Sequence, residues 1–215
     1  MSTDSPTPIL ELQAFVCRRG GDEVFAPADL VLQAGEILWL TGANGAGKTS
    51  FLRGLIGLVE HSCERFAFCG KPLPAARAEL LEHCNWIGHE AAMKSEFSIA
   101  ENLTLDCQQR GRELSQSVEY ALAAVGLPEL ADFPAGTLSA GQRRRAALAR
   151  LLLRPARLWL LDEPLANLDQ ASSALLAEVM ANFVAQGGAL ILTGHGQLPS
   201  RLQVRELHLE APAWS

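Results

Sequence analysis

The stretch GANGAGKT, from Gly42 to Thr49, decides the fold class of this chain. It follows a short apolar run, EILWL from Glu36 to Leu40, and it precedes a segment that we expect to be helical from about Lys48. Glycines allow the backbone to wrap closely around an anion, so that successive N–H groups point at phosphate oxygens and the start of the helix adds partial positive charge. The pattern G-x-x-x-x-G-K-[ST] between a strand and a helix therefore predicts a phosphate-binding loop in an α/β nucleotide-binding protein.

Two side chains of this loop have predicted chemical roles. Lys48 would reach the β- and γ-phosphates of a bound nucleotide and take part in catalysis, and the Thr49 hydroxyl would ligate Mg²⁺. The loop as a whole would bind through its backbone N–H groups. The predicted nucleotide-binding residues here are Gly42, Ala43, Asn44, Gly45, Ala46, Gly47, Lys48, Thr49 and Ser50.

A second group of candidate functional residues follows an apolar strand, in LWLLDEP from Leu158 to Pro164. Open α/β folds bind ligands at the carboxyl ends of their strands, where Asp162 and Glu163 would emerge. We assign Asp162 to magnesium and Glu163 to the general base that orients or deprotonates the attacking water. Taken alone, such a carboxylate pair is about as well explained as the N-cap of a following helix. The phosphate loop upstream favours the catalytic interpretation.

The rest of the chain alternates short apolar runs with helical patterns. Strands are expected between residues 9 and 40 and at 65–69, 84–88, 158–162, 189–194 and near 204–210. Helices are expected from the capping pair Ser98 and Glu101 to Gly111, at about 115–125, from Ser139 onwards and at 173–185. This alternation predicts a mainly parallel sheet with a helical insertion between its middle strands. We expect one domain over residues 1–215, with a helical subdomain at about 94–153.

Composition limits the functions to consider. A formal net charge of −6 argues against a general nucleic-acid binder, so the arginines 143–145, 150 and 154 are interpreted as a solvated helix face. No run approaches the roughly 20 apolar residues that cross a bilayer, and the N-terminus lacks the pattern of a secretory signal. The five cysteines lie at irregular spacings, which favours free thiols over a zinc site or a disulfide framework. We expect a cytoplasmic chain.

The segment LSAGQ, from Leu138 to Gln142, begins with a capping box formed by Ser139 and Gln142. With the phosphate loop and the DEP strand on either side, it resembles the signature motif of the ABC ATPases. ANLD, ending at Asp169, resembles the D-loop of that family, and TGH, ending at His195, resembles its switch histidine. The ordered series of motifs is far more specific than any one of them, and it covers nearly the whole chain.

The resemblance implies a P-loop NTPase of the ABC type, with a mainly parallel core sheet, an N-terminal antiparallel β subdomain and a helical subdomain. It implies that ATP, with Mg²⁺, lies between the phosphate loop of one copy and the signature helix of a second copy packed head to tail. Ser139, Gly141, Gln142 and Asp169 would then contact nucleotide, and His195 would act in catalysis.

The sequence departs from the family pattern at some positions. His89 stands where the family's Q-loop has glutamine, whose counterpart contacts nucleotide and the metal shell and relays the nucleotide state to the membrane partner. Histidine can hydrogen-bond similarly and can also titrate. Ala140 replaces a signature glycine, while its backbone N–H is kept. No tyrosine stands where the family stacks an aromatic ring on adenine, and Arg18 or Arg19 could stack there instead.

Several segments together, including WIGH, LSAGQRRRAALARL and ALILTGH, resemble the ATP-binding subunits of cytochrome c maturation systems. That resemblance implies a peripheral protein at the cytoplasmic face of the bacterial inner membrane, with a CcmB-like multi-span partner and a link to haem delivery. Three alternatives remain open: an ABC subunit for another cargo, a soluble ABC protein acting on nucleic acid or ribosomes, and a nucleotide-binding module without hydrolysis. Intact Lys48 and Glu163 argue against the last.

Overall fold

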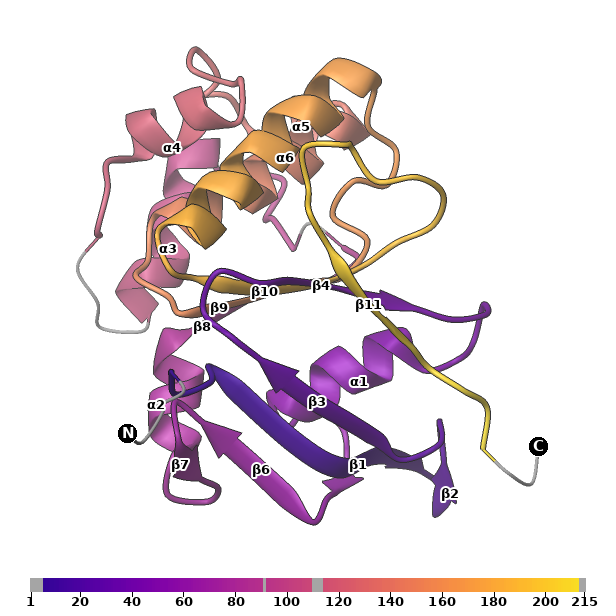
Figure 1. The fold of residues 1–215 in the computed structure, drawn as a ribbon. Coiled ribbons are helices and arrows are strands. Elements are labelled where there is room, and N and C mark those ends of the chain that lie inside the picture. Colours follow the sequence, from indigo (N-terminus) through magenta and orange to yellow (C-terminus); the bar gives the residue numbers. More distant parts are fainter. Residues whose placement is uncertain (1–5, 91, 110–113, 213–215) are drawn as a thin grey trace.

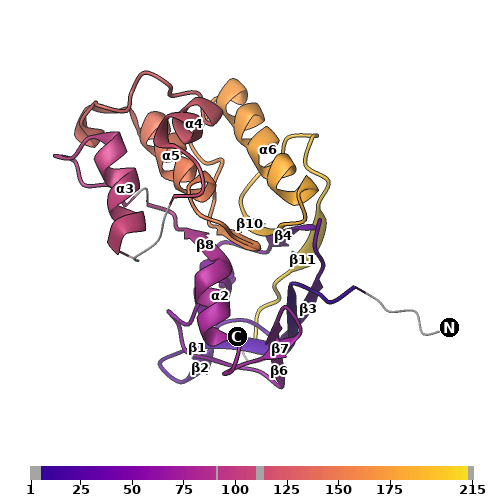
Figure 2. The same cartoon turned by 90° about the vertical axis from the view of Figure 1, so that its left-hand side faces the viewer.

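The computed structural model describes residues 6–90, 92–109 and 114–212. The fold has layers, which Figures 1 and 2 show from two sides. A sheet of five strands lies in the middle, helices α3 to α6 cover one face of it, and helix α1 with a second sheet lies on the other face.

The middle sheet is parallel throughout. Its strand order is β11-β4-β10-β9-β8, and every neighbouring pair runs in the same direction. The prediction of a mainly parallel core sheet is therefore confirmed. The strands are β4 (Ile37–Thr41), β8 (Cys84–Ile87), β9 (Leu158–Leu161), β10 (Ala189–Thr193) and β11 (Arg205–His208).

Strand β9 shows why these runs are apolar without alternation. Successive side chains of a strand point to opposite faces of the sheet. Leu158 and Leu160 belong to the apolar core on the α1 side, while Trp159 and Leu161 belong to the core beneath the helices. Both faces are covered, so every position of the strand is buried. The carboxyl end of this buried strand carries Asp162 into the site.

The second sheet is antiparallel and is built from the N-terminal part of the chain, as the family resemblance implied. Its central strand β1 bulges between Leu12 and Phe15, where Ala14 has φ 48° and its N–H donates to Asp29 Oδ1 at 2.7 Å. The strands are β1 (Leu10–Arg19), β2 (Asp22–Glu23), β3 (Ala28–Leu32), β5 (His61–Ser62), β6 (Arg65–Phe68) and β7 (Lys71–Pro72).

Helix α1 packs between the two sheets. Its Phe51 is fully buried, and the ring meets that of Phe15 on β1 edge-on, with 5.2 Å between centroids. This packing fixes the start of α1 and the loop before it. The helices are α1 (Lys48–Leu55), α2 (Arg77–His83), α3 (Ile99–Gln109), α4 (Val118–Ala124), α5 (Ala140–Ala149) and α6 (Gln170–Ala185), with short 3₁₀ turns η1 (Ala135–Thr137) and η2 (Arg150–Leu152).

Most predicted helix starts agree with the structure. Ser98 and Glu101 form the expected reciprocal pair before α3, with N···O distances of 2.8 and 3.1 Å. The second helix was expected from about residue 115 and starts at Val118, because the Ser117 hydroxyl accepts the Tyr120 N–H and caps it there. The stop predicted at Gly111 lies outside the described residues. The helical insertion lies between β8 and β9, the second and third strands of the parallel sheet in chain order, as expected, although β8 is an edge strand in space.

The cysteines described are free thiols, namely Cys17, Cys63, Cys69 and Cys84. Burial raises the pKa of Cys17 and of Cys84 to about 12, which keeps both thiols protonated at neutral pH. Within the described ranges, no helix combines the length and the apolar character that a membrane span requires.

Candidate nucleotide-binding and catalytic site

The predicted phosphate loop connects β4 to α1 and curls around Lys48. The Lys48 ammonium group donates to the carbonyl oxygens of Gly42, at 2.8 Å, and Ala43, at 3.0 Å, and the residue is only 8% exposed. Gly47 has φ 91°, and a Cβ there would lie 2.7 Å from Val24 Cγ1, so both conformation and space require glycine. Ala43, Asn44 and Gly45 lie exposed at the tip of the loop.

The start of α1 is suited to an anion. Gly47 caps the helix without a side-chain acceptor, so the first N–H groups are directed out of the helix end. Thr49 and Ser50 lie in the first turn, next to the loop. Backbone donors, the helix dipole and one ammonium group thus lie together at the loop and the start of α1, which is the arrangement that binds phosphate.

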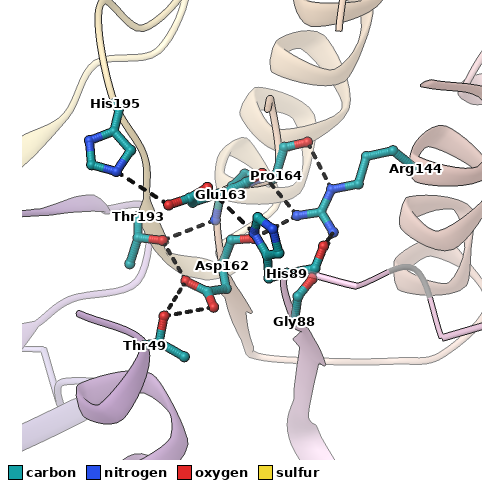
Figure 3. A network of polar contacts seen from close by, with 9 residues as sticks. All are labelled: Thr49, Gly88, His89, Arg144, Asp162, Glu163, Pro164, Thr193 and His195. Carbon is teal, nitrogen blue, oxygen red and sulfur yellow. Dashed lines mark hydrogen bonds and ion pairs between the residues drawn. The ribbon is translucent and has the colours of Figure 1, made fainter. Parts of the chain in front are cut away.

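Asp162 lies directly beyond β9 and is 2% exposed. Its carboxylate accepts the Thr49 hydroxyl, at 3.1 Å to Oδ1 and 2.9 Å to Oδ2, and the Thr193 hydroxyl at 2.8 Å (Figure 3). A helix and two strands thereby bring three oxygen-bearing side chains together. Sequence reasoning missed Thr193, although a threonine at the end of the apolar run ALILT is a visible signal.

The Thr49 and Asp162 pair fits a magnesium ion that is completed by nucleotide. Mg²⁺ prefers oxygen ligands, keeps several waters and is commonly held by one or two carboxylates plus substrate phosphates. In the part of the chain that is described, no group of three or more His, Cys, Asp or Glu is placed to hold a metal ion by itself. The donor set therefore suits an ion that arrives with a polyphosphate.

Glu163 points away from Asp162, although the two residues are neighbours. Its backbone has φ 51°, a left-handed conformation that costs about 1–3 kcal/mol outside glycine and persists only where the surroundings hold it. The carboxylate lies between two imidazoles, with Oε2 3.4 Å from His89 Nδ1 and Oε1 3.3 Å from His195 Nε2 (Figure 3). The Glu163 side chain is 27% exposed, so water can reach it.

His89 therefore contacts Glu163. Among the described residues, no hydrogen bond or ion pair joins His89 to Thr49 or Asp162, and its metal role stays a prediction. His195 follows β10 and approaches Glu163 from the opposite side (Figure 3). These three side chains were predicted from separate motifs, and the structure brings them together.

The signature residues lie at the start of α5. Ser139 N–H donates to the Gln142 amide oxygen at 2.9 Å, and Gln142 N–H donates to the Ser139 hydroxyl at 3.1 Å, which is the predicted capping box. A Cβ on Gly141 would lie 3.7 Å from the Asn167 oxygen, so the helix start adjoins the predicted D-loop. Asp169 caps α6 by accepting Ser172 N–H at 2.7 Å, which lowers the pKa of its carboxyl.

The signature helix start and the phosphate loop are separate within one chain. No hydrogen bond or ion pair joins Ser139, Gly141 or Gln142 to residues 42–50 in the described structure. At the predicted adenine position, the Arg18 guanidinium pairs with Glu23 at 3.3 Å. An adenine ring that stacks on Arg18 would therefore share that side chain with an exposed ion pair.

Sequence reasoning misjudged Arg144 and Arg154. Both were placed on a solvated helix face, yet each is only 7% exposed. Arg144 lies in α5. Residues three and four apart share a helix face. Arg144 therefore lies on the same face as Ala147 and Leu148, which are both buried, and this spacing was the available signal. Its guanidinium donates to the carbonyl oxygens of Asp162 and Pro164, which flank Glu163 (Figure 3).

Comparisons with known proteins agree with these motifs. The family profile described as ABC transporter matches residues 25–166. The proteins named cytochrome c biogenesis ATP-binding export protein CcmA are similar to this chain over nearly their full length. The one from Pseudomonas fluorescens (strain Pf0-1) is 39% identical over 209 residues, covering 97% of this chain and 99% of the relative. The one from Xanthomonas campestris pv. campestris (strain 8004) is 41% identical over 207 residues, covering 96% of each.

A solved structure supports the fold. A putative ABC transporter (ATP-binding protein) from Pyrococcus furiosus superposes with a TM-score of 0.79 at 21% sequence identity, covering 93% of this chain and 96% of that one. The sequence relatives and the matched profile, together with the ordered motifs around Lys48, Asp162 and Glu163, identify the family. The chain belongs to the ABC transporter family of ATPases and, within it, to the CcmA group of ATP-binding proteins.

Proposed function

We propose that this chain binds and hydrolyses Mg-ATP as a subunit of an ABC transporter complex that energises c-type cytochrome biogenesis. The observation that carries the chemical part is the strand end at Asp162 and Glu163, where one carboxylate meets Thr49 and the other lies between two histidines. The CcmA relatives, named for cytochrome c biogenesis and export, support the biological part.

Nucleotide binding would change the hydrogen-bond acceptors of Lys48. The Lys48 ammonium group now donates to two loop carbonyls, and phosphate oxygens would replace or join these acceptors. A charged acceptor makes a stronger hydrogen bond than a neutral carbonyl, so the exchange favours binding. Thr49 and Asp162 would hold Mg²⁺, which when bound neutralises phosphate charge and polarises the terminal phosphoryl group.

Glu163 would accept a proton from the attacking water. It is a carboxylate with a partly exposed side chain, and the imidazoles of His89 and His195 restrict where its oxygens lie. A positioned general base contributes typically about 10²–10⁴-fold to a rate. Because Asp162 is buried and satisfied by two hydroxyls, it is the poorer candidate for this role.

The signature helix would act on nucleotide held by a second copy of the chain. Within one chain, Ser139 and its neighbours lie apart from the phosphate loop, while the capped start of α5 presents backbone N–H groups and the positive end of a helix dipole. A head-to-tail dimer would use these donors on the far side of the triphosphate. Hydrolysis would remove the charge that holds the two copies together. We also propose that residues 94–153 form the helical subdomain that carries this helix.

A groove near His89 is the proposed docking surface for a membrane partner. It is lined by residues of the core and of the helical region, including Arg53, Leu58, Leu81, Trp86, His89 and Arg150. Leu58 is 65% exposed and Leu81 is 42% exposed, and both line this one groove, so two large apolar side chains are available there to a partner. His89 belongs both to this groove and to the Glu163 contact, so docking could be sensed at the proposed base.

We infer that the occupant is a CcmB-like multi-span subunit at the cytoplasmic face of the bacterial inner membrane. The acidic net charge of −6 argues against the alternative of an ABC protein acting on nucleic acid. An ABC transporter for another cargo is the remaining alternative, because the membrane subunit selects the cargo.

Glu163→Gln is expected to retain nucleotide binding while turnover falls by about 10²–10⁴-fold, because the amide cannot accept the proton. The trapped dimer should be visible by size-exclusion chromatography with ATP and Mg²⁺, alongside phosphate release. The matched control is Glu178→Gln on α6, where an exposed carboxylate pairs with Arg201 and turnover should be unchanged. Wild-type phosphate release by the Glu163 variant would refute the general-base assignment.

Lys48→Ala is expected to weaken ATP binding by about tenfold or more, since a charge-assisted contact to phosphate is worth roughly 1.5–3 kcal/mol. Fluorescent-nucleotide titration measures this directly. Lys71→Ala serves as the control, because Lys71 is exposed and pairs with Glu79 on the surface. If both variants bind with the affinity of the unmodified chain, the phosphate-loop role of Lys48 is wrong.

Leu58→Asp is expected to reduce the yield of a co-expressed CcmB-like subunit recovered with the chain by about tenfold, because a charge in an apolar contact costs more than 1.4 kcal/mol. Nucleotide binding by the isolated chain should not change. Phe133→Asp is the matched control, since Phe133 is 51% exposed and lies outside the groove. Equal recovery from both variants would place the docking surface elsewhere.

A further inference from the structure

The guanidinium of Arg144 is satisfied entirely by backbone carbonyl oxygens. Nε donates to Pro164 O at 3.4 Å, Nη1 to Gly88 O at 2.7 Å and His89 O at 2.9 Å, and Nη2 to Asp162 O at 2.6 Å and Glu163 O at 2.9 Å. A guanidinium carries five N–H donors in one fixed plane. Each donor therefore has a carbonyl acceptor.

These acceptors belong to two segments that are far apart in the sequence. One segment, 162–164, carries the proposed metal ligand and the proposed base, and the other, 88–89, carries the histidine that contacts that base. The contact between His89 and Glu163 is therefore held at both of its ends by the same cation (Figure 3). A planar group with rigid donor geometry fixes the separation of the two backbones more tightly than a flexible ammonium group could.

The charge of Arg144 has an electrostatic effect as well. Burial lowers the pKa of its guanidinium, and the carboxylates of Asp162 and Glu163 act in the opposite direction. Burying a cation costs free energy unless hydrogen bonds and nearby opposite charge compensate. The carbonyl dipoles and the two carboxylates supply that compensation. The strained left-handed backbone of Glu163 lies between carbonyls that this group binds, which explains how the strain persists.

Arg144 also connects this backbone to the signature helix. It lies in α5, whose capped start at Ser139 is the part that would meet the nucleotide of a second copy. A helix rises about 1.5 Å per residue, so Arg144 is within about 8 Å of that start along the axis. A displacement of the helix start would therefore be transmitted to the carbonyl groups of Glu163 and His89 through the Arg144 side chain.

We propose that Arg144 is a positioning residue that sets the backbone of Glu163 against that of His89 and couples both to the signature helix. The role rests on the proposed function, because it concerns the hydrolysis assigned to Glu163. Arg144 contacts no proposed ligand, and it acts through the residues it holds.

Kinetics with a matched control tests the proposal. Arg144→Ala should lower kcat by about 100-fold, as misplacement of a reacting group by about 1 Å does, while the dissociation constant for a fluorescent ATP analogue stays within about threefold. Arg144→Lys should recover part of kcat, because it keeps the charge with fewer and less ordered donors. Arg145→Ala is the control: Arg145 is the next residue on α5 and, among the described residues, donates to Val125 O and Gly126 O of the helical region, so kcat should stay near that of the unmodified chain.

A second measurement does not depend on hydrolysis. Hydrogen exchange of the full chain should accelerate in segments 84–90 and 160–166 for Arg144→Ala, but not for Arg145→Ala. If the unmodified chain hydrolyses ATP and Arg144→Ala matches it in kcat and in exchange, the positioning role is overturned while the proposed function stands. If the unmodified chain does not hydrolyse ATP, the proposed function fails, and exchange alone decides whether Arg144 holds the two segments. A parallel loss of nucleotide affinity and kcat would also overturn the proposal, because it would indicate general unfolding of the site.

Discussion

The site depends on how the chain leaves β9. Asp162 continues the buried strand and turns its carboxylate towards the Thr49 and Thr193 hydroxyls, and the left-handed backbone of the next residue turns the Glu163 carboxylate towards His89 and His195. Two adjacent acids thus occupy different environments, one buried and one reachable by water. Arg144 donates hydrogen bonds to the backbone carbonyl oxygens of both residues. The backbone geometry at this strand end therefore determines which carboxylate is buried and which one water can reach.

The fold supplies the rigidity that this strand end needs. Strands β4, β9 and β10 are adjacent in a parallel sheet, so their carboxyl ends open at one edge, where the phosphate loop, Asp162 and Thr193 meet. Apolar cores pack against both faces of the sheet and keep the positions of these strands fixed relative to one another. The helical region contacts the strand end through α5, where Arg144 donates to the carbonyl oxygens of Asp162 and Glu163. The proposed nucleotide, partner copy and membrane subunit would therefore act on the same few backbone groups.

The sequence predicted what local patterns encode. The glycine loop, the strand end at Asp162 and the capping boxes at Ser98 and Ser139 each depend on a few consecutive residues, and the structure has them where they were expected. The sequence could not predict that Glu163 lies between His89 and His195. That arrangement brings together three segments that are distant in the sequence, and it requires a left-handed backbone at Glu163. Arg144 was misjudged because a row of arginines suggests solvent, whereas its burial depends on carbonyls brought from residues 88–89 and 162–164. The start of the second helix was misplaced because the Ser117 cap was overlooked.

The central claim is that the two neighbouring carboxylates have different roles, Asp162 as the metal ligand and Glu163 as the base. Electron paramagnetic resonance of Mn²⁺ bound with ATP measures this most directly, because the ion reports its own coordination in each variant. The account predicts that Asp162→Asn loses the ordered Mn²⁺ signal in the nucleotide complex, while Glu163→Gln keeps it unchanged. Loss of the signal in Glu163→Gln with retention in Asp162→Asn would contradict the account.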